Sequence, residues 1–87
     1  MEWMEGLEGQ AIHGIIMTRL ERVEDGNLGN CHGVGDGVSE LVINFGPGYR
    51  VYFGQDDHII VLLNGGKKRT QKADIATARR FWRNYNA

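Results

Sequence analysis

The stretch from Gly37 to Ala78, GVSELVINFGPGYRVYFGQDDHIIVLLNGGKKRTQKADIATA, decides the fold of this chain. It holds a run of alternating apolar and polar residues, a Gly-Pro-Gly turn, a second alternating run and, after two aspartates, a third apolar run. Successive side chains of a strand point to opposite faces of a sheet, so these runs predict three antiparallel strands. A short strand at Cys31 to Val34 would extend the meander to four.

The turn sets the predicted register. If residues 46–48 form the loop, the pairs expected across the first hairpin are Phe45 with Tyr49, Ile43 with Val51, and Leu41 with Phe53. A second turn near Asp56 and Asp57 would pair Phe53 with Ile60 and Val51 with Leu62. Opposite residues share a face, so Arg50 and Tyr52 are expected on the face opposite the apolar one.

Helical patterns flank the sheet. Ile12, Ile16, Leu20 and Val23 recur at three- and four-residue spacing, which predicts a helix from Gln10 to Val23. Trp3, Met4 and Leu7 fit a short amphipathic turn before it, making a helical hairpin. A last helix is expected from Thr70, its N-cap, to Tyr85, with its apolar side docked on the protein. The fold class is α+β: a single domain over residues 1–87, with the hairpin packed on a small antiparallel sheet.

Composition bounds the class of protein. The chain has 87 residues, a net charge of −1 and one cysteine, Cys31, which is typical of a reducing cytosol. No apolar run is long enough for a membrane span, so we expect a cytoplasmic protein without membrane contact. Residues 1–45 hold two basic and eight acidic side chains, a net of −6, whereas residues 46–87 hold eight and three, a net of +5. This division indicates a face for a polyanion or an acidic protein.

Arg50 is the first candidate for chemistry. Its planar guanidinium matches phosphate oxygens and would stabilise charge developing on a phosphate, but the residues alone favour a cross-strand ion pair with Glu40 or Asp36. Tyr52, next to it on the same face, would stack on a base or transfer a proton, or simply pack.

Basic residues follow the third strand. Lys67, Lys68 and Arg69 come directly after Gly65-Gly66, where glycines let a phosphate approach the backbone, although such a run is also typical of a solvated turn. Lys72, Arg79 and Arg83 form a strip along one border of the last helix. The three histidines lack metal-ligand spacing, so no metal and no cofactor are expected.

The chain resembles the RelE/ParE superfamily of toxins from bacterial toxin–antitoxin pairs, in its HigB-like, phage-derived branch of addiction module killer proteins. The resemblance spans nearly the whole chain and rests on an ordered series of motifs: Gly26-Asn27-Leu28-Gly29, Gly35-Asp36-Gly37-Val38-Ser39-Glu40-Leu41, Gly46-Pro47-Gly48-Tyr49-Arg50-Val51-Tyr52-Phe53, Leu63-Asn64-Gly65-Gly66-Lys67-Lys68, Thr70-Gln71 and Asp74-Ile75. Members usually have a strand before the tryptophan that corresponds to Trp3. Its absence here leaves a sheet edge unpaired, from which we expect a homodimer.

The resemblance implies two helices on one face of the sheet and a basic opposite face on which messenger RNA lies, on the ribosome. It implies a metal-independent endoribonuclease in which Arg50 binds the phosphate, Lys68 neutralises charge or transfers a proton, and Tyr52 orients RNA. Further RNA contacts would come from Lys67, Arg69, Lys72, Arg79 and Arg83, and a helix-turn-helix antitoxin would neutralise the toxin. The alternative is a noncatalytic binding module that inhibits gyrase or only binds its antitoxin. The endoribonuclease requires Arg50 and Lys67–Arg69 to meet on one surface.

Overall fold

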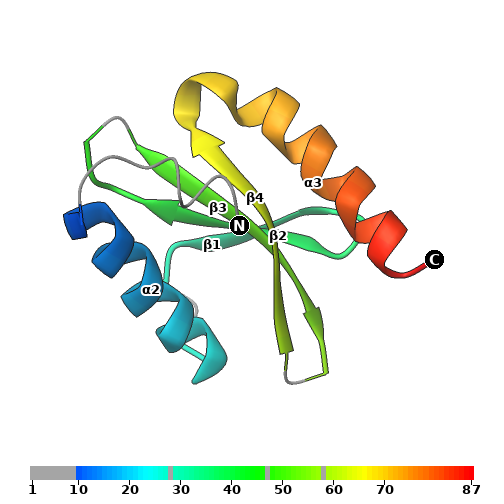
Figure 1. The fold of residues 1–87 in the computed structure, drawn as a ribbon, viewed down its shortest axis with the longest axis horizontal. Helices are drawn as coiled ribbons and strands as arrows, with labels where there is room; N and C mark the ends of the chain where they lie inside the picture. Colours follow the sequence, from blue (N-terminus) through cyan, green and yellow to red (C-terminus); the bar gives the residue numbers. More distant parts are fainter. Residues whose placement is uncertain (1–9, 28, 47, 58) are drawn as a thin grey trace.

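The computed structural model describes residues 10–27, 29–46, 48–57 and 59–87, which form a four-stranded antiparallel sheet with one helix against each face (Figure 1). The strands follow one another in the order β1-β2-β3-β4. The elements are α2 (Gln10–Glu24), β1 (Cys31–Gly35), β2 (Val38–Ile43), β3 (Tyr49–Asp56), β4 (Ile59–Lys67), the 3-10 turn η1 (Lys68–Thr70) and α3 (Gln71–Tyr85). The predicted α+β class, the meander and the short strand at Cys31 are confirmed. The predicted turn around Trp3, Met4 and Leu7 lies outside the described residues.

Helix α2 covers the apolar face that the alternation predicts. Its residues Ile16, Leu20 and Val23 are buried against the sheet. The sheet residues of the same core are Leu41, Ile43, Val51 and Phe53. The helix ends within one residue of its predicted bound, and Gly26 follows it with a positive φ of 85°.

Helix α3 covers the opposite face, where the resemblance implies an open surface (Figure 1). Its buried Ala78, with Ile75 and Trp82 beside it, packs on a second core. The sheet side of that core is Val38, Tyr52 and Leu63, all 9% exposed or less. The expectation of an open face is therefore wrong for these residues, because this face also carries apolar side chains that need a cover.

The register of the first hairpin differs from its prediction by two residues. Ile43 lies opposite Tyr49 and Leu41 opposite Val51, while Phe45 falls beyond the end of β2 and pairs with no strand. The turn spans residues 44–48 instead of 46–48, since Gly46 and Gly48 both adopt positive φ inside a longer loop. A shift of two residues preserves the faces, so Arg50 and Tyr52 do lie opposite Val51 and Phe53 as predicted.

The second hairpin contains a bulge. Tyr52 lies opposite Asn64 but Phe53 lies opposite Leu62, which leaves Leu63 as an additional residue in β4. The predicted pairs of Phe53 with Ile60 and of Val51 with Leu62 are therefore wrong. The bulge turns both Leu63 and Asn64 toward α3. Leu63 lies in the core between the sheet and α3, and Asn64 Nδ2 donates to the Asp74 carbonyl at 3.1 Å.

Two glycines of the sheet make room for Trp82. A Cβ atom on Gly54 would lie 2.5 Å from ring carbons of Trp82, and one on Gly37 would lie 2.9 Å from its indole nitrogen. The indole thus sits directly on backbone, which brings the second half of α3 close to β3.

We expect Gly54→Ala to destabilise the fold by about 1–3 kcal/mol, because the added methyl would overlap the Trp82 ring and force it to shift. Chemical denaturation measures the change. Gly33→Ala is the matched control, since Gly33 lies on exposed β1 with no atom within 4 Å of the position of an added Cβ. Equal effects of the two substitutions would contradict the close packing of Trp82 on Gly54.

Candidate functional site

A buried carboxylate, Glu40, is the centre of a polar cluster between the sheet and α3. Glu40 is 4% exposed, and its Oε2 accepts hydrogen bonds from Tyr52 Oη at 2.9 Å and from Gln71 Nε2 at 2.8 Å. Tyr52 lies directly opposite Glu40 on the neighbouring strand, and Gln71 is the first residue of α3. The cluster therefore ties the start of α3 to the middle of the sheet.

Arg50 supplies the cation of this cluster. Its Nε lies 3.5 Å from Glu40 Oε2, and its side chain is 12% exposed. The ion pair with Glu40 that the sequence left open is thus present. The alternative pair with Asp36 is not, because Asp36 binds two other arginines. A buried carboxylate needs such compensation, since removing it from water without a partner costs several kcal/mol.

Tyr52 has no exposed surface and packs beside Val38 and Leu63. Burial, and then the hydrogen bond to the negatively charged Glu40, raise the pKa of Tyr52 above its ordinary value of 10.0, so the phenol stays neutral. Stacking on an RNA base requires an exposed ring, which Tyr52 does not present. The packing role that the sequence left open is the one observed.

Tyr52→Phe should lower the free energy of unfolding by about 2 kcal/mol, because the buried Glu40 carboxylate would lose one of its donors. Tyr85→Phe is the matched control: its hydroxyl donates to Asp56 at 2.8 Å, but the residue is exposed and water can replace the bond. Urea denaturation of both variants tests this difference. A loss no larger for Tyr52→Phe than for Tyr85→Phe would show that the Glu40 cluster does not stabilise the fold.

The basic turn, defined as Lys67, Lys68 and Arg69, is exposed at the end of β4 and in η1. It meets Arg50 around Gly48. The Gly48 carbonyl accepts a hydrogen bond from the Lys68 backbone N–H at 3.0 Å and a longer one from Arg50 Nη1 at 3.4 Å. A Cβ on Gly48 would lie 3.7 Å from Arg50 Nη1 and 3.9 Å from Lys68 Cβ. Arg50 and the backbone of Lys68 therefore share the Gly48 carbonyl, while a common surface formed by Arg50 with the side chains of all three basic residues stays a prediction.

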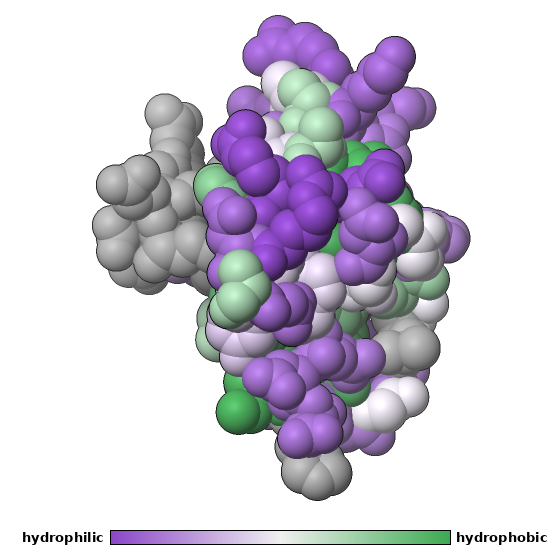
Figure 2. Space-filling model, turned by 90° about the vertical axis from the view of Figure 1, so that its right-hand side faces the viewer, coloured by the Kyte–Doolittle hydropathy of each residue, from purple (hydrophilic) through white to green (hydrophobic). Residues whose placement is uncertain are grey.

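The strip predicted on the last helix divides into two parts. Lys72 is exposed on the first turn of α3, next to the basic turn. Arg79 Nε and Arg83 Nη1 instead bind Asp36 Oδ2 at 3.0 and 3.1 Å, in the turn between β1 and β2. The side of the molecule that carries α3 is mainly hydrophilic (Figure 2). Its charges near Asp36 are thus already paired.

The pKa of Asp36 lies below its ordinary value of 3.8, mainly because of the hydrogen bond from Arg79 and the charge of that residue. Folded Asp36 then binds fewer protons than unfolded Asp36 at about pH 4. The stabilisation from its ion pairs is present above the unfolded pKa and is lost as pH falls through the lowered folded pKa.

We expect the Asp36 carboxyl to titrate at higher pH in Arg79→Gln than in the wild type, because the main cause of its low pKa would be removed. NMR titration of the side-chain carboxyl carbon measures the midpoint. Arg80→Gln, a change of the same kind on the same helix, should leave the midpoint in place. An unchanged midpoint in Arg79→Gln would contradict the observed pair.

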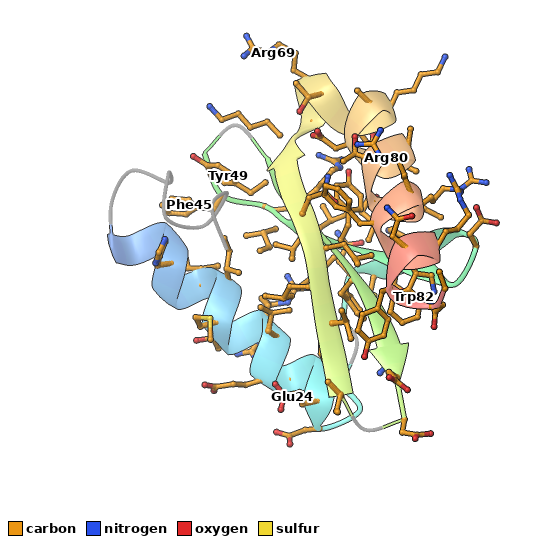
Figure 3. All side chains as sticks on the ribbon, turned by 45° about the vertical axis from the view of Figure 1, so that its right-hand side comes forward. Glu24, Phe45, Tyr49, Arg69, Arg80 and Trp82 are labelled. Carbon is orange, nitrogen blue, oxygen red and sulfur yellow. The ribbon has the colours of Figure 1, made fainter. Side chains whose placement is uncertain are left out.

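Negative charge gathers at the other end of the molecule from the basic turn. Figure 3 shows Glu24, at the end of α2, and Arg69 at opposite ends. The exposed Asp56 ends β3 and Asp57 follows it in the turn to β4, which is at the same end of the molecule as the C-terminus of α2 (Figure 1). Exposed charges of opposite sign therefore lie at two ends of the described part of the molecule.

Sequence reasoning missed the central role of Glu40 and did not identify Gln71. The predicted register places Glu40 opposite Gly54, two residues from its true partner Tyr52, so the contact between carboxylate and phenol was hidden. The single charged residue of the strand VSELVI is the available signal, because a carboxylate among buried apolar residues needs a partner.

Other features of the described residues add no further chemistry to this site. A hollow of about 410 Å³ on α2 is lined by Gly14, Ile15, Thr18, Arg19 and Arg22, and none of the predicted site residues borders it. Within the described ranges, no group of three or more His, Cys, Asp or Glu side chains is placed to hold a metal ion. In the same part of the chain, no helix is long and apolar enough to cross a membrane.

Comparison with known proteins identifies a relative in Haemophilus influenzae. The two sequences are 40% identical over 78 residues, which is 88% of this chain and 79% of the relative, an uncharacterized protein. No family model matches the chain. No solved structure matches it.

Proposed function

This chain belongs to the same family as the uncharacterized Haemophilus influenzae protein, and we propose that it is the toxin component of a bacterial toxin–antitoxin module. In this proposal it is an endoribonuclease that cleaves messenger RNA, on the ribosome or free, without a metal ion. The proposal rests on the motif resemblance and on one observation, the meeting of Arg50 with the basic turn around Gly48. Its partners are mRNA and a helix-turn-helix antitoxin, and the homodimer stays a prediction.

The two cations differ in how they are held. Arg50 is fixed, since Glu40 lies beside its Nε and Gly48 accepts from its Nη1, so the guanidinium loses little freedom on binding a phosphate. Lys68 is exposed, and only its backbone is anchored, by the bond to Gly48. A rigid cation beside a mobile one suits a phosphate that gains negative charge during a reaction.

The reaction that fits is transfer of the phosphate to the neighbouring 2′-oxygen. The 2′-hydroxyl attacks phosphorus and loses its proton to water, while the bond from phosphorus to the 5′-oxygen breaks and that oxygen takes up a proton. The products are a 2′,3′-cyclic phosphate and a 5′-hydroxyl end. In this scheme Arg50 stabilises the charge on the phosphate oxygens, and the ammonium group of Lys68 neutralises charge or donates the proton to the 5′-oxygen.

A noncatalytic binding module is the second candidate, and the Arg50–Glu40 pair favours it. Arg50 already has its charge paired with a carboxylate at 3.5 Å, and the buried Tyr52 hydroxyl already donates to Glu40, so both residues have a structural role that requires no substrate. The basic turn would then serve only as a docking surface for an acidic partner, for gyrase or for the antitoxin.

Lys68→Ala should reduce mRNA cleavage by about a hundredfold, the effect of losing one stabilising donor worth about 3 kcal/mol. It should also relieve growth arrest on expression. Lys68 is exposed, so folding should be unaffected. Arg50→Ala should act in the same way. It also removes the cation beside Glu40, so a thermal melt must show that this variant is still folded.

Arg22→Ala is the charge-matched control, because Arg22 is an exposed arginine on α2, across the sheet from Arg50. It should keep both arrest and cleavage. Undiminished cleavage by a folded Lys68→Ala protein would refute the assigned role. Arrest without any RNA cleavage by the wild type would favour the noncatalytic module.

A further inference from the structure

The burial of Tyr52 leaves other aromatic rings beside the cations. Phe45 lies in the turn between β2 and β3, and it is 43% exposed. Tyr49, at the start of β3, is half-buried on the α2 face of the sheet. Figure 3 shows Phe45 and Tyr49 in the same part of the molecule, on the side of the sheet away from Trp82.

Backbone hydrogen bonds place the residues that carry these rings next to the basic turn. Gly48 N–H donates to the Phe45 carbonyl at 3.1 Å, and the Gly48 carbonyl accepts from Lys68. Tyr49 lies directly opposite Lys67 in the pairing of β3 with β4. A Cβ on Gly46 would lie 3.7 Å from Tyr49 Cε2, so the turn that carries Phe45 folds over the edge of the Tyr49 ring.

An exposed phenylalanine in a turn that is hydrogen-bonded to the backbone of a basic segment has a specific chemical use. Proteins hold single-stranded nucleic acid by stacking bases on aromatic rings while basic side chains follow the phosphates. The other large exposed aromatic residues of the described chain are placed differently: Tyr85 donates to Asp56 and stacks on Trp82, and Phe81 lies under Arg80 on α3. Phe45 and Tyr49 alone among these adjoin the basic turn.

We infer that Phe45 and Tyr49 form a stacking site for a base of single-stranded RNA, next to the phosphate held by Arg50 and Lys68. This inference rests on the proposed function and adds to it the residues that recognise a base. It assigns to Phe45 and Tyr49 the base contact that the sequence assigned to Tyr52. The site is open only to unpaired bases, because a base inside a duplex has no free face for an aromatic ring.

The test is binding of two fluorescent oligonucleotides of equal length, one of single-stranded 2′-O-methyl RNA and one with the same backbone but no bases. The methyl group blocks attack by the 2′-oxygen, so binding is measured without cleavage. Phe45→Ala and Tyr49→Leu should each weaken binding of the base-containing oligonucleotide about tenfold and leave the abasic one unchanged. Leucine at 49 preserves apolar packing on the core, and the exposed Phe45 carries the test if Tyr49→Leu fails to fold.

Two controls separate the inference from the function beneath it. Phe81→Ala removes a phenylalanine of similar exposure, 40%, and should change neither affinity. Lys68→Ala should weaken both oligonucleotides alike. Wild-type affinity in Phe45→Ala and Tyr49→Leu, or an equal loss for both oligonucleotides, would overturn the stacking site while the proposed function stands. Failure of the wild type to bind either oligonucleotide would overturn the stacking site and also the cleavage of free messenger RNA.

Discussion

The fold depends on one carboxylate that is buried between a sheet and a helix. Glu40 is the one charged residue of β2, where Val38, Leu41, Val42 and Ile43 are buried, and groups from other elements must compensate its charge on the same face. Tyr52 comes from β3, Gln71 from the start of α3, and Arg50 from β3 near the basic turn. The same atom, Oε2, meets all three, so the position of the helix and the orientation of the arginine are set together.

This shared contact explains why a polar group lies at the border of an apolar core. On one side of Glu40, Tyr52 leads into the core of Val38, Leu63 and Ala78. On the other side, Arg50 leads out to Gly48 and to the solvated turn. A substitution of Glu40 would therefore affect both the packing of α3 on the sheet and the position of the Arg50 guanidinium.

The sequence predicted correctly which face of the sheet each side chain occupies, but it did not predict which residues lie opposite one another on neighbouring strands. Alternation alone separates Arg50 and Tyr52 from Val51 and Phe53, and a register error of two residues leaves that separation intact. The error itself came from the turn, where two glycines with positive φ support a five-residue loop that Gly-Pro-Gly does not specify by itself. The apolar side of α3 predicted that this helix docks, but only the three-dimensional contacts of Ala78 and Trp82 show on which face. For the candidate site, residue chemistry indicates Arg50, its pair with Glu40 and the basic turn, whereas the Tyr52–Glu40 contact and the unpaired position of Phe45 depend on the correct loop length.

Exposed charges of opposite sign lie at two ends of the described part of this nearly neutral molecule. Glu24, Asp56 and Asp57 lie at one end and Lys67–Arg69 at the other, while the net charge is only −1. The electric field of a polyanion orients such a molecule, although the net charge of the molecule gives no overall attraction. It would therefore arrive with its basic end forward, and only at distances within a Debye length, about 8 Å at physiological salt. Orientation, more than long-range capture, would then govern how often an encounter is productive.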